Sequence, residues 1–232
     1  MSKMFPFITR TTNPLAIRKC SFQCIYCWAE DLKKNRLKNT TRYLLLNQNN
    51  AVCTVIQKDL DEKFLAEDFV FVGTMGDMFA PDIPSEAIQQ VLEVYRYDLK
   101  TNYLFLTKNP GRYKEFLNTF LKFNATLGAT IETNRDTSKY SKAPSPEQRF
   151  YELYDLEYPR KFLSIEPIID FDFTYFTDWI RRIPNLHKIA VGYDNYKHGL
   201  PEPSLAVTKQ LIERLREWGY EVIEKTLREP LT

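Results

Sequence analysis

Glycine is scarce in this chain of 232 residues, which contains only 7 glycines. Average usage of ~7% would give a chain of this length about 16. We therefore expect the glycines that remain to lie where the backbone needs a residue without a side chain.

Cysteine is also scarce, with 4 residues in the chain. The first residues lack the long apolar stretch and the small-residue cleavage site of a signal peptide. We therefore expect a cytoplasmic protein whose cysteines are reduced, which argues against a disulfide framework.

Long hydrophobic runs are missing as well, since none approaches the ~20 apolar residues of a membrane helix. No membrane partner is therefore expected. Hydrophobic residues make up 44% of the chain and charged residues 27%, with a formal net charge of +2. This composition excludes a disordered chain, and so small a net charge does not by itself indicate a nucleic-acid partner.

Short apolar or β-branched runs alternate with amphipathic helical stretches, and no Pro/Gly/Ser-rich linker divides the chain. This alternation predicts parallel βαβ units in one α/β domain. A closed eight-fold barrel typically needs ~250 residues, so we expect a partial, open TIM-like barrel of about six parallel βα units. The predicted strands are 15–18, 69–72, 103–106, 126–131, 162–165, 188–191 and 221–223.

Capping residues mark several of the expected helices. Ser85 is the expected N-cap of one helix, and Ser145 opens a second with a capping-box sequence. Apolar residues at helical spacing predict a helix over 111–123. The last clear helix follows Ser204 and ends at Gly219, a residue suited to the C′ position.

Four glycines occupy strand positions that suit a ligand site. Gly73 and Gly76 follow one predicted strand, Gly192 follows another, and Gly128 lies inside a third. Ligands of parallel α/β folds bind at the carboxyl ends of the strands. These glycines are equally typical of ordinary strand-to-helix turns, so they support a ligand site only in combination with other signals.

Three of the four cysteines crowd into eight residues, as Cys20, Cys24 and Cys27 in a C-x3-C-x2-C pattern. Thiolates this close in sequence can converge on one metal centre, and three ligands leave one coordination position open. Cys53, 26 residues further on, leaves open a closed zinc site or a buried thiol without a ligand role. The best physical interpretation is an iron–sulfur cluster with three thiolates and one free iron.

The motif, with Tyr26 before its last cysteine, resembles the signature of the radical S-adenosylmethionine (SAM) superfamily. The resemblance implies a single domain over residues 1–232 with its core at about 13–225. It also implies a [4Fe–4S] cluster that reductively cleaves SAM to a 5′-deoxyadenosyl radical, which abstracts hydrogen from a substrate. Segments 72–79, 104–110, 127–134 and 162–167 resemble a short, phage-protein-like branch of unknown function, and the cysteine loop is similar to that of spore photoproduct lyases.

The resemblance assigns SAM contacts at the ends of the predicted strands. Gly73 to Asp77 occupy the place of the glycine-rich segment that holds the methionine amino group, although the usual Gly-Gly-Glu form is absent. Acidic residues at such positions are also typical of strand-end caps and surface ion pairs. The full set of expected SAM contacts is Tyr26, Gly73, Thr74, Met75, Gly76, Asp77, Thr130, Glu132, Asn134, Ser164, Glu166 and Gly192.

The substrate is the least determined part of this interpretation. Cations at Lys108, Arg112, Arg135, Lys139 and Lys142 suit a nucleotide or nucleic acid, while protein and small-molecule substrates stay open. Cys53 is a candidate hydrogen-atom donor. A flavodoxin- or ferredoxin-like electron donor is implied as a partner. The alternative function is a non-catalytic, metal-stabilised module, with zinc or an iron–sulfur cluster bracing a loop that binds nucleic acid.

Overall fold

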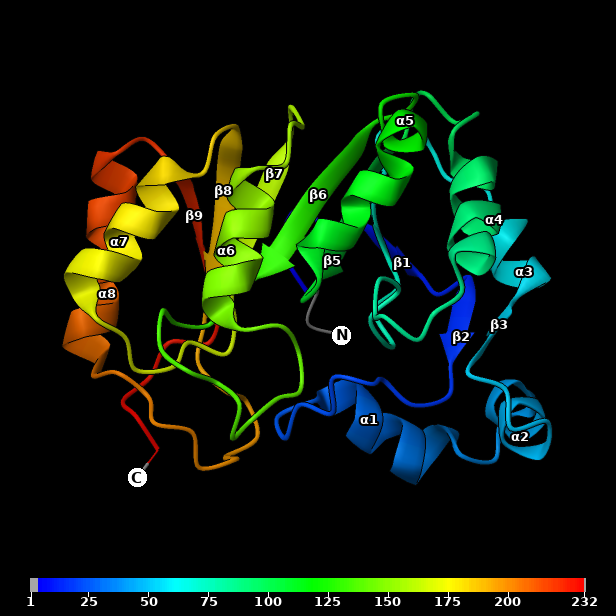
Figure 1. Ribbon diagram of the computed structural model, residues 1–232, viewed down its shortest axis with the longest axis horizontal. Coiled ribbons are helices and arrows are strands. Elements are labelled where there is room, and N and C mark those ends of the chain that lie inside the picture. Colours follow the sequence, from blue (N-terminus) through cyan, green and yellow to red (C-terminus); the bar gives the residue numbers. More distant parts are fainter. Residues whose placement is uncertain (1–3, 232) are drawn as a thin grey trace.

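The computed structural model describes residues 4–231, which contain a curved sheet of seven parallel strands in the order β1-β4-β5-β6-β7-β8-β9 (Figure 1). The curled sheet is a half-barrel, so the predicted open TIM-like barrel of parallel units is confirmed. The strands are β1 (Arg10–Thr12), β4 (Phe69–Val72), β5 (Asn102–Thr107), β6 (Ala125–Thr130), β7 (Lys161–Ile165), β8 (Leu186–Val191) and β9 (Glu221–Glu224).

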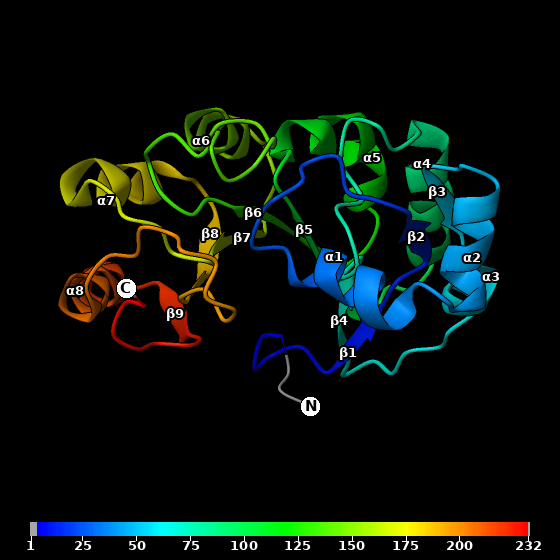
Figure 2. The ribbon, with the colours of Figure 1, turned by 90° about the horizontal axis from the view of Figure 1, so that it is seen from below.

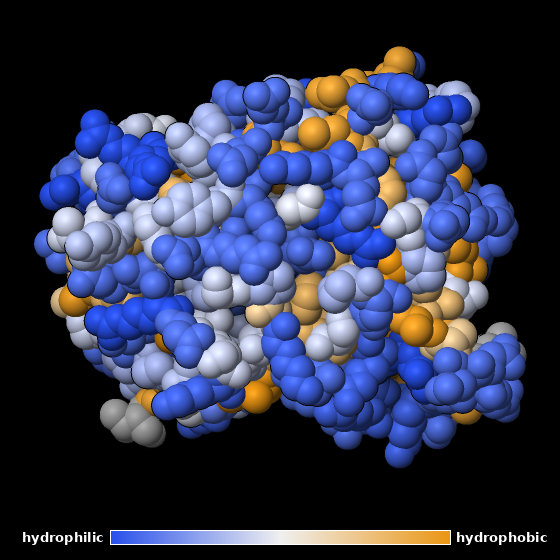
Figure 3. All heavy atoms as spheres, viewed as in Figure 1, coloured by the Kyte–Doolittle hydropathy of each residue, from blue (hydrophilic) through white to orange (hydrophobic). Residues whose placement is uncertain are grey.

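Helices cover the convex side of the sheet in an arc that runs from α8 through α7, α6 and α5 to α4 (Figure 2). Their bounds are α4 (Ser85–Tyr95), a 3₁₀ helix (Pro110–Phe116) leading into α5 (Leu117–Phe120), α6 (Pro146–Tyr154), α7 (Phe173–Arg182) and α8 (Leu205–Glu217). The viewing side of Figure 3, which these helices cover, is mostly hydrophilic with scattered hydrophobic patches. Among residues 4–231, no helix has the length and apolar character needed to span a membrane.

The strands are apolar because both of their faces are buried. Val70, Phe105 and Leu163 pack into the large core under the helices, whereas Phe71 and Leu104 point to the concave side. Alternation of this kind with little exposure is expected for a parallel sheet covered on both faces. The core therefore lies between sheet and helices, and a second, smaller cluster fills the inside of the half-barrel.

The first strand of the sheet differs from the prediction. Residues 15–18 were expected to open the sheet, but β2 (Leu15–Ile17) pairs antiparallel with β3 (Cys53–Val55) in a separate two-stranded sheet. The sheet instead begins with β1, whose sequence Arg-Thr-Thr has two exposed side chains. A short polar edge strand carries no hydrophobic pattern, so nothing local distinguished it from a loop.

The structure contains a helix at each of the four expected places, although two of these helices differ in detail from the expectation. Ser145 and Ser204 cap α6 and α8, and each side-chain oxygen accepts a backbone N–H of the first turn. Ser85 is not an N-cap; Pro84 takes that position, and the Ser85 hydroxyl donates to Glu115 instead. The expected helix over 111–123 is a 3₁₀ helix followed by the single turn of α5.

The segment from β2 to β4 contains the cysteine loop and several short helices. After β2, the chain passes through the cysteine loop (residues 20–27) into α1 (Trp28–Leu32), a π-helical turn (Lys33–Leu37) and α2 (Thr41–Gln48). After β3 it forms α3 (Gln57–Leu60) and then enters β4. In Figure 2, α1 lies in front of the carboxyl ends of the sheet strands, which brings the cysteine loop to that end of the half-barrel.

Candidate active site

A cavity of about 470 Å³ opens at the carboxyl ends of the strands. Its lining draws on the cysteine loop, the ends of β4 to β9 and the N-terminal segment, so it collects residues from across the whole chain. This is the ligand-binding end of parallel α/β folds. Of the residues expected from sequence, those that line it are Cys20, Cys24, Tyr26, Cys27, Gly73, Thr74, Gly76, Asp77, Thr130, Ser164 and Glu166.

The cysteine loop is fixed by hydrogen bonds to its neighbours. The Ile25 amide donates to the carbonyl of Tyr140, and the Lys142 amide donates to the carbonyl of Phe22. The Cys20 amide donates to the Glu30 carboxylate over 3.0 Å. The loop is thus held at Phe22 and Ile25 by a segment distant in sequence and at Cys20 by α1, and all three cysteines line one cavity.

The three cysteines are a donor set that suits an iron–sulfur cluster. Burial raises the pKa of Cys20 to about 12 and raises the pKa of Cys27. Thiols in such an apolar setting stay protonated until a metal centre replaces the proton, because the thiolate is the ligand. Among residues 4–231 no group of three or more His, Cys, Asp or Glu side chains is close enough to hold a single metal ion.

The glycine-rich loop (residues 73–77) is held against β1 and β5. Asn13 Oδ1 accepts the Met75 amide at 2.9 Å and the Thr74 hydroxyl at 3.1 Å. Asp77 accepts the Thr107 hydroxyl and the Lys108 amide, each over 2.7 Å, while burial raises the pKa of its carboxyl. Gly73 has a φ of +81°, a conformation that favours glycine. The backbone of the loop therefore reaches the cavity in a fixed position.

Glu132 lies behind the cavity and does not line it. Its carboxylate, which is fully buried, pairs with Lys108, accepts Arg149 Nη1 at 2.7 Å and accepts the Tyr26 hydroxyl at 2.7 Å. Burial lowers the pKa of Lys108 to about 8 and that of Arg149 to about 10. The Glu132 network thus connects the cysteine loop to β5 and α6, and only Lys108 and Tyr26 of this group line the cavity.

Four other expected residues also lie outside the cavity lining. Asn134 accepts the Asp172 amide at the start of α7, which is a loop contact. Met75 donates its amide to Asn13, Cys53 sits half-buried in β3, and Gly192 packs against Lys225 and Glu166.

Gly128 is required by side-chain packing within the sheet and not by a ligand. A Cβ there would lie 3.0 Å from side-chain carbons of both Leu106 and Phe162. The glycine in mid-strand therefore makes room for neighbouring strands, which is the other common reason for a glycine inside a sheet.

Few of the cations expected at the rim reach the cavity. Arg112 donates to the carbonyls of Ala80 and Ile83, and Arg135 pairs with Asp170. Lys108 lines the cavity, together with Lys225, which the sequence did not single out. The lining also contains three carboxylates, Asp77, Glu166 and Asp194. The cavity is therefore not a strongly cationic site.

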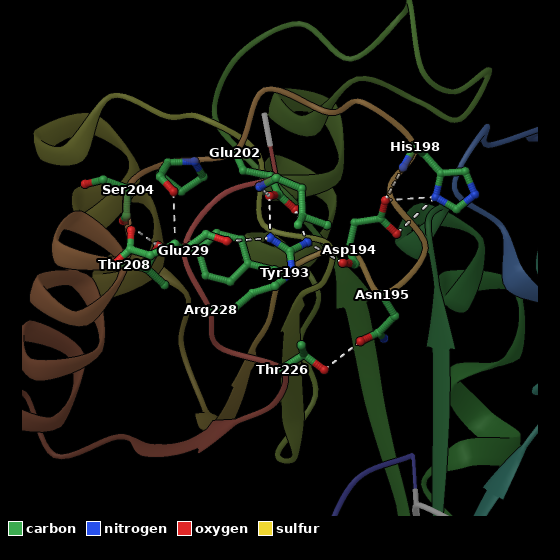
Figure 4. A network of polar contacts seen from close by, with 12 residues as sticks. Tyr193, Asp194, Asn195, His198, Glu202, Ser204, Thr208, Thr226, Arg228 and Glu229 are labelled. Atoms are coloured by element: carbon green, nitrogen blue, oxygen red, sulfur yellow. Dashed lines mark hydrogen bonds and ion pairs between the residues drawn. The ribbon is translucent and has the colours of Figure 1, made fainter.

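One side of the cavity is a C-terminal wall, formed by residues 193–196 and Lys225. A C-terminal arm (residues 225–231) makes polar contacts with this wall and with the loop that follows it, as Figure 4 shows. Arg228 makes two hydrogen bonds to the buried Glu202, of 2.7 and 2.8 Å, and donates to the Asp194 carbonyl. The Thr226 hydroxyl donates to Asn195 at 2.6 Å.

Sequence reasoning missed Arg149, Lys225 and Phe5. Arg149 is a charged residue beside apolar Phe150 and Leu153 in α6, an exception to the helix pattern that signals a buried partner. Lys225 follows β9 directly, the same strand-end position that drew attention to Gly192. Phe5 offers no local signal, because its place in the cavity depends on how the N-terminal segment folds back.

Comparison with solved structures finds a similar fold in spore photoproduct lyases and in a radical SAM methyltransferase. A cysteine-to-serine mutant of spore photoproduct lyase matches with a TM-score of 0.59 at 14% identity, covering 95% of this chain and 64% of that one. A radical SAM methyltransferase from Sphaerobacter thermophilus matches with a TM-score of 0.56 at 14% identity, covering 96% and 67%. A spore photoproduct lyase double mutant with bound AdoMet and dinucleoside spore photoproduct matches with a TM-score of 0.56 at 13% identity, covering 88% and 59%.

This chain spans under two thirds of most of the matched spore photoproduct lyase structures, for example 58% of one with dinucleoside spore photoproduct, and 75% of one other. Comparison with curated protein sequences gives no match. A family profile, described as "Protein of unknown function (DUF5131)", matches residues 4–190, which is most of the chain. On that match, the chain belongs to the DUF5131 family.

Proposed function

We propose that this protein is a radical SAM enzyme. The observation that carries the proposal is the meeting of Cys20, Cys24 and Cys27 with the glycine-rich loop in one cavity. That cavity lies at the carboxyl ends of a parallel half-barrel whose fold matches spore photoproduct lyase and a radical SAM methyltransferase. Cysteine spacing and fold are independent signals, and both favour the same chemistry.

Cys20, Cys24 and Cys27 would hold a [4Fe–4S] cluster through their thiolates. When bound, the cluster supplies the electron that reductively cleaves SAM to methionine and a 5′-deoxyadenosyl radical, with the electron delivered by a flavodoxin- or ferredoxin-like donor. Ser141 Oγ lies 3.1 Å from Cys24 Sγ, so it is placed to hydrogen-bond that sulfur. Hydrogen bonds to ligand sulfurs tune the reduction potential of such clusters.

The residues around the cysteine loop are suited to hold SAM. The backbone of the glycine-rich loop is fixed by Asn13 and Asp77, so its polar groups present a preorganised edge to the cavity. Thr130 and Ser164 end neighbouring strands and offer hydroxyls for a ribose. Phe22, Trp28 and Leu106 add apolar lining that excludes water from a reactive intermediate.

Anaerobic reconstitution tests the proposal. The wild-type protein should bind about four irons in a reducible cluster, as expected of a [4Fe–4S] centre. It should release 5′-deoxyadenosine when SAM and dithionite are added. The Cys24→Ala variant should lose both properties, whereas Cys53→Ala, the matched control outside the cavity, should keep them.

Two results would contradict the proposal. A colourless protein that binds one zinc ion and that Cys24→Ala changes only in stability would favour the metal-stabilised nucleic-acid-binding module. A reducible cluster without SAM cleavage would show that the site binds a cluster but does not catalyse this reaction.

A further inference from the structure

Part of the cavity lining has no role in the proposed SAM site, although the sequence resemblance counted Glu166 among the SAM contacts. The cysteine and glycine-rich loops lie near β4, β5 and β6, whereas Glu166 and Lys225 follow β7 and β9 at the other end of the sheet order. Both of these side chains line the cavity. The inference that follows concerns this part of the lining and rests on the proposed function.

Glu166 and Lys225 lie close together but do not hydrogen-bond to each other. Lys225 Nζ is 4.0 Å from Glu166 Oε1, too far for a hydrogen bond, and Ser164 Oγ lies 3.5 Å from Glu166 Oε2. Among residues 4–231, Lys225 Nζ makes no hydrogen bond to protein; it stacks over the Phe5 ring at 5.0 Å. By contrast, Lys108 is tied to Glu132 and Tyr26. The pair therefore keeps one acceptor and one donor available to a ligand.

Gly192 is what allows this pair to form. A Cβ at position 192 would lie 2.7 Å from Lys225 Cβ and 3.1 Å from Glu166 Oε1. Any side chain there would push the two residues aside. The ends of β7, β8 and β9 thus place the Glu166 carboxylate, an acceptor, next to the Lys225 ammonium, a donor. This close approach is the physical reason for a glycine at the end of β8.

The surroundings of the pair restrict what can bind to it. Phe5, Phe71 and Leu106 provide an apolar floor, suited to the face of a flat ring. A phosphate bound here would be repelled by the negative charge of Glu166. Asp77 and Asp194 place two further carboxylates in the lining. The polar edge of the ligand must therefore be neutral and must carry an N–H beside a C=O.

We propose that the Glu166–Lys225 pair is a substrate-recognition site for a nucleobase with a lactam or imide edge. Glu166 accepts the ring N–H, Lys225 donates to the adjacent carbonyl, and the ring lies against Phe5 and Phe71. A secondary peptide amide in its trans form holds N–H and C=O on opposite sides and does not match the pair. The substrate class is then a uracil-, thymine- or guanine-type base, and the sugar–phosphate portion stays toward solvent.

Binding of nucleosides to the reconstituted protein tests this proposal. Uridine and thymidine should bind at least tenfold more tightly than N3-methyluridine and N3-methylthymidine, which lack the ring N–H. Glu166→Gln and Lys225→Met should each lose that discrimination. SAM affinity, measured in parallel by equilibrium dialysis, should change less than twofold in Lys225→Met.

Two controls keep the result interpretable. Lys188→Met removes another lysine that stacks on a phenylalanine of the N-terminal segment, at 5.5 Å from Phe7 but outside the cavity, and should preserve the discrimination. Gly192→Ala should weaken uridine binding through displacement of the pair. Thermal melts establish that each variant is folded.

Three outcomes would overturn the inference. Equal binding of the methylated and unmethylated nucleosides would exclude recognition of an N–H edge. Loss of SAM affinity in Glu166→Gln would place Glu166 in the SAM site. Binding of N-acetylglutamine amide in place of nucleosides would replace a base by a primary amide. Each outcome leaves cluster formation and SAM cleavage unaffected as tests of the proposed function.

Discussion

At the scale of single residues, buried charges determine most of the site. The carboxylate of Glu132 is fully buried between the cations of Lys108 and Arg149. Charges removed from water are stable only when they are paired and hydrogen-bonded. The network therefore fixes the position of Lys108 in the cavity and holds the hydroxyl of Tyr26.

Removing the central carboxylate should be costly. We expect Glu132→Gln to lower the free energy of unfolding by about 3–5 kcal/mol, because it leaves two buried cations without their counter-charge. Urea unfolding monitored by circular dichroism measures the change. Glu115→Gln, which removes a carboxylate that is 47% exposed, is the control and should cost less than about 1 kcal/mol. Equal effects in the two variants would contradict the role given to the network.

Glu166 should make stability depend on pH. Burial raises the pKa of its carboxyl from 4.5 to about 7, with Lys225 opposing the shift. The folded state therefore binds more protons than the unfolded state between these values, so stability is fully present below about pH 4.5 and falls as pH rises through about 7.

The size of this effect is at most about 3 kcal/mol, from ~1.4 kcal/mol per pKa unit. Urea unfolding between pH 4.5 and 8 should show the decline in wild type, and Glu166→Gln should reduce it. A variant with the wild-type pH profile would show that another group titrates.

At the scale of secondary-structure elements, strand ends and strand interiors place different demands on the chain. Gly192 lets the ends of β7, β8 and β9 approach, and Gly128 lets β5, β6 and β7 pack side by side. The first supports the cavity, while the second supports the core. Two glycines at similar-looking positions in the sequence are thus required for different reasons, one by the cavity and one by the core.

A methyl group at position 128 should overpack the sheet. We expect Gly128→Ala to cost about 1–3 kcal/mol, because its Cβ would press on Leu106, Phe162 and the carbonyl of Phe105. Thermal unfolding measures the loss. Gly199→Ala is the comparison, because a Cβ there would contact nothing within 4 Å. Its only cost is the backbone strain of an alanine at a φ of +68°. A larger loss at position 199 than at 128 would contradict the packing argument.

At the scale of the whole molecule, the C-terminal arm supports one wall of the cavity. Arg228 of the arm binds Glu202 in the loop before α8. The Thr226 carbonyl of the arm accepts the Tyr193 amide at 2.9 Å. This wall lies beyond residue 190, where the family match ends. One wall of the cavity is thus built by residues outside the matched region.

Breaking the Arg228–Glu202 pair should loosen this wall. We expect Arg228→Met to lower stability by about 3 kcal/mol, because Glu202 stays buried without its partner. Hydrogen exchange in residues 193–203 should become faster, whereas exchange in β5 should not change. Arg135→Met removes an exposed ion pair with Asp170 and is the control. Unchanged exchange in the wall would show that the arm does not hold it.

The sequence alone predicted the open barrel, the cap at Ser145, the helix that follows Ser204, and a cysteine loop at the ligand-binding end. These features are local: periodicity, capping and spacing act within a few residues. It missed β1, because a polar edge strand depends on its partner β4 for its existence. It could not separate Glu132, which is buried behind the cavity, from Glu166, which lines it.

Cysteine spacing and strand alternation therefore predicted the kind of site and the end of the fold where it lies. Tertiary structure alone decided which charges meet: Glu132 with Lys108 and Arg149, and Glu166 with Lys225. Those partners come from strands and helices far apart in the chain. Electrostatic pairing depends on distance in space and on burial, and a linear sequence contains neither.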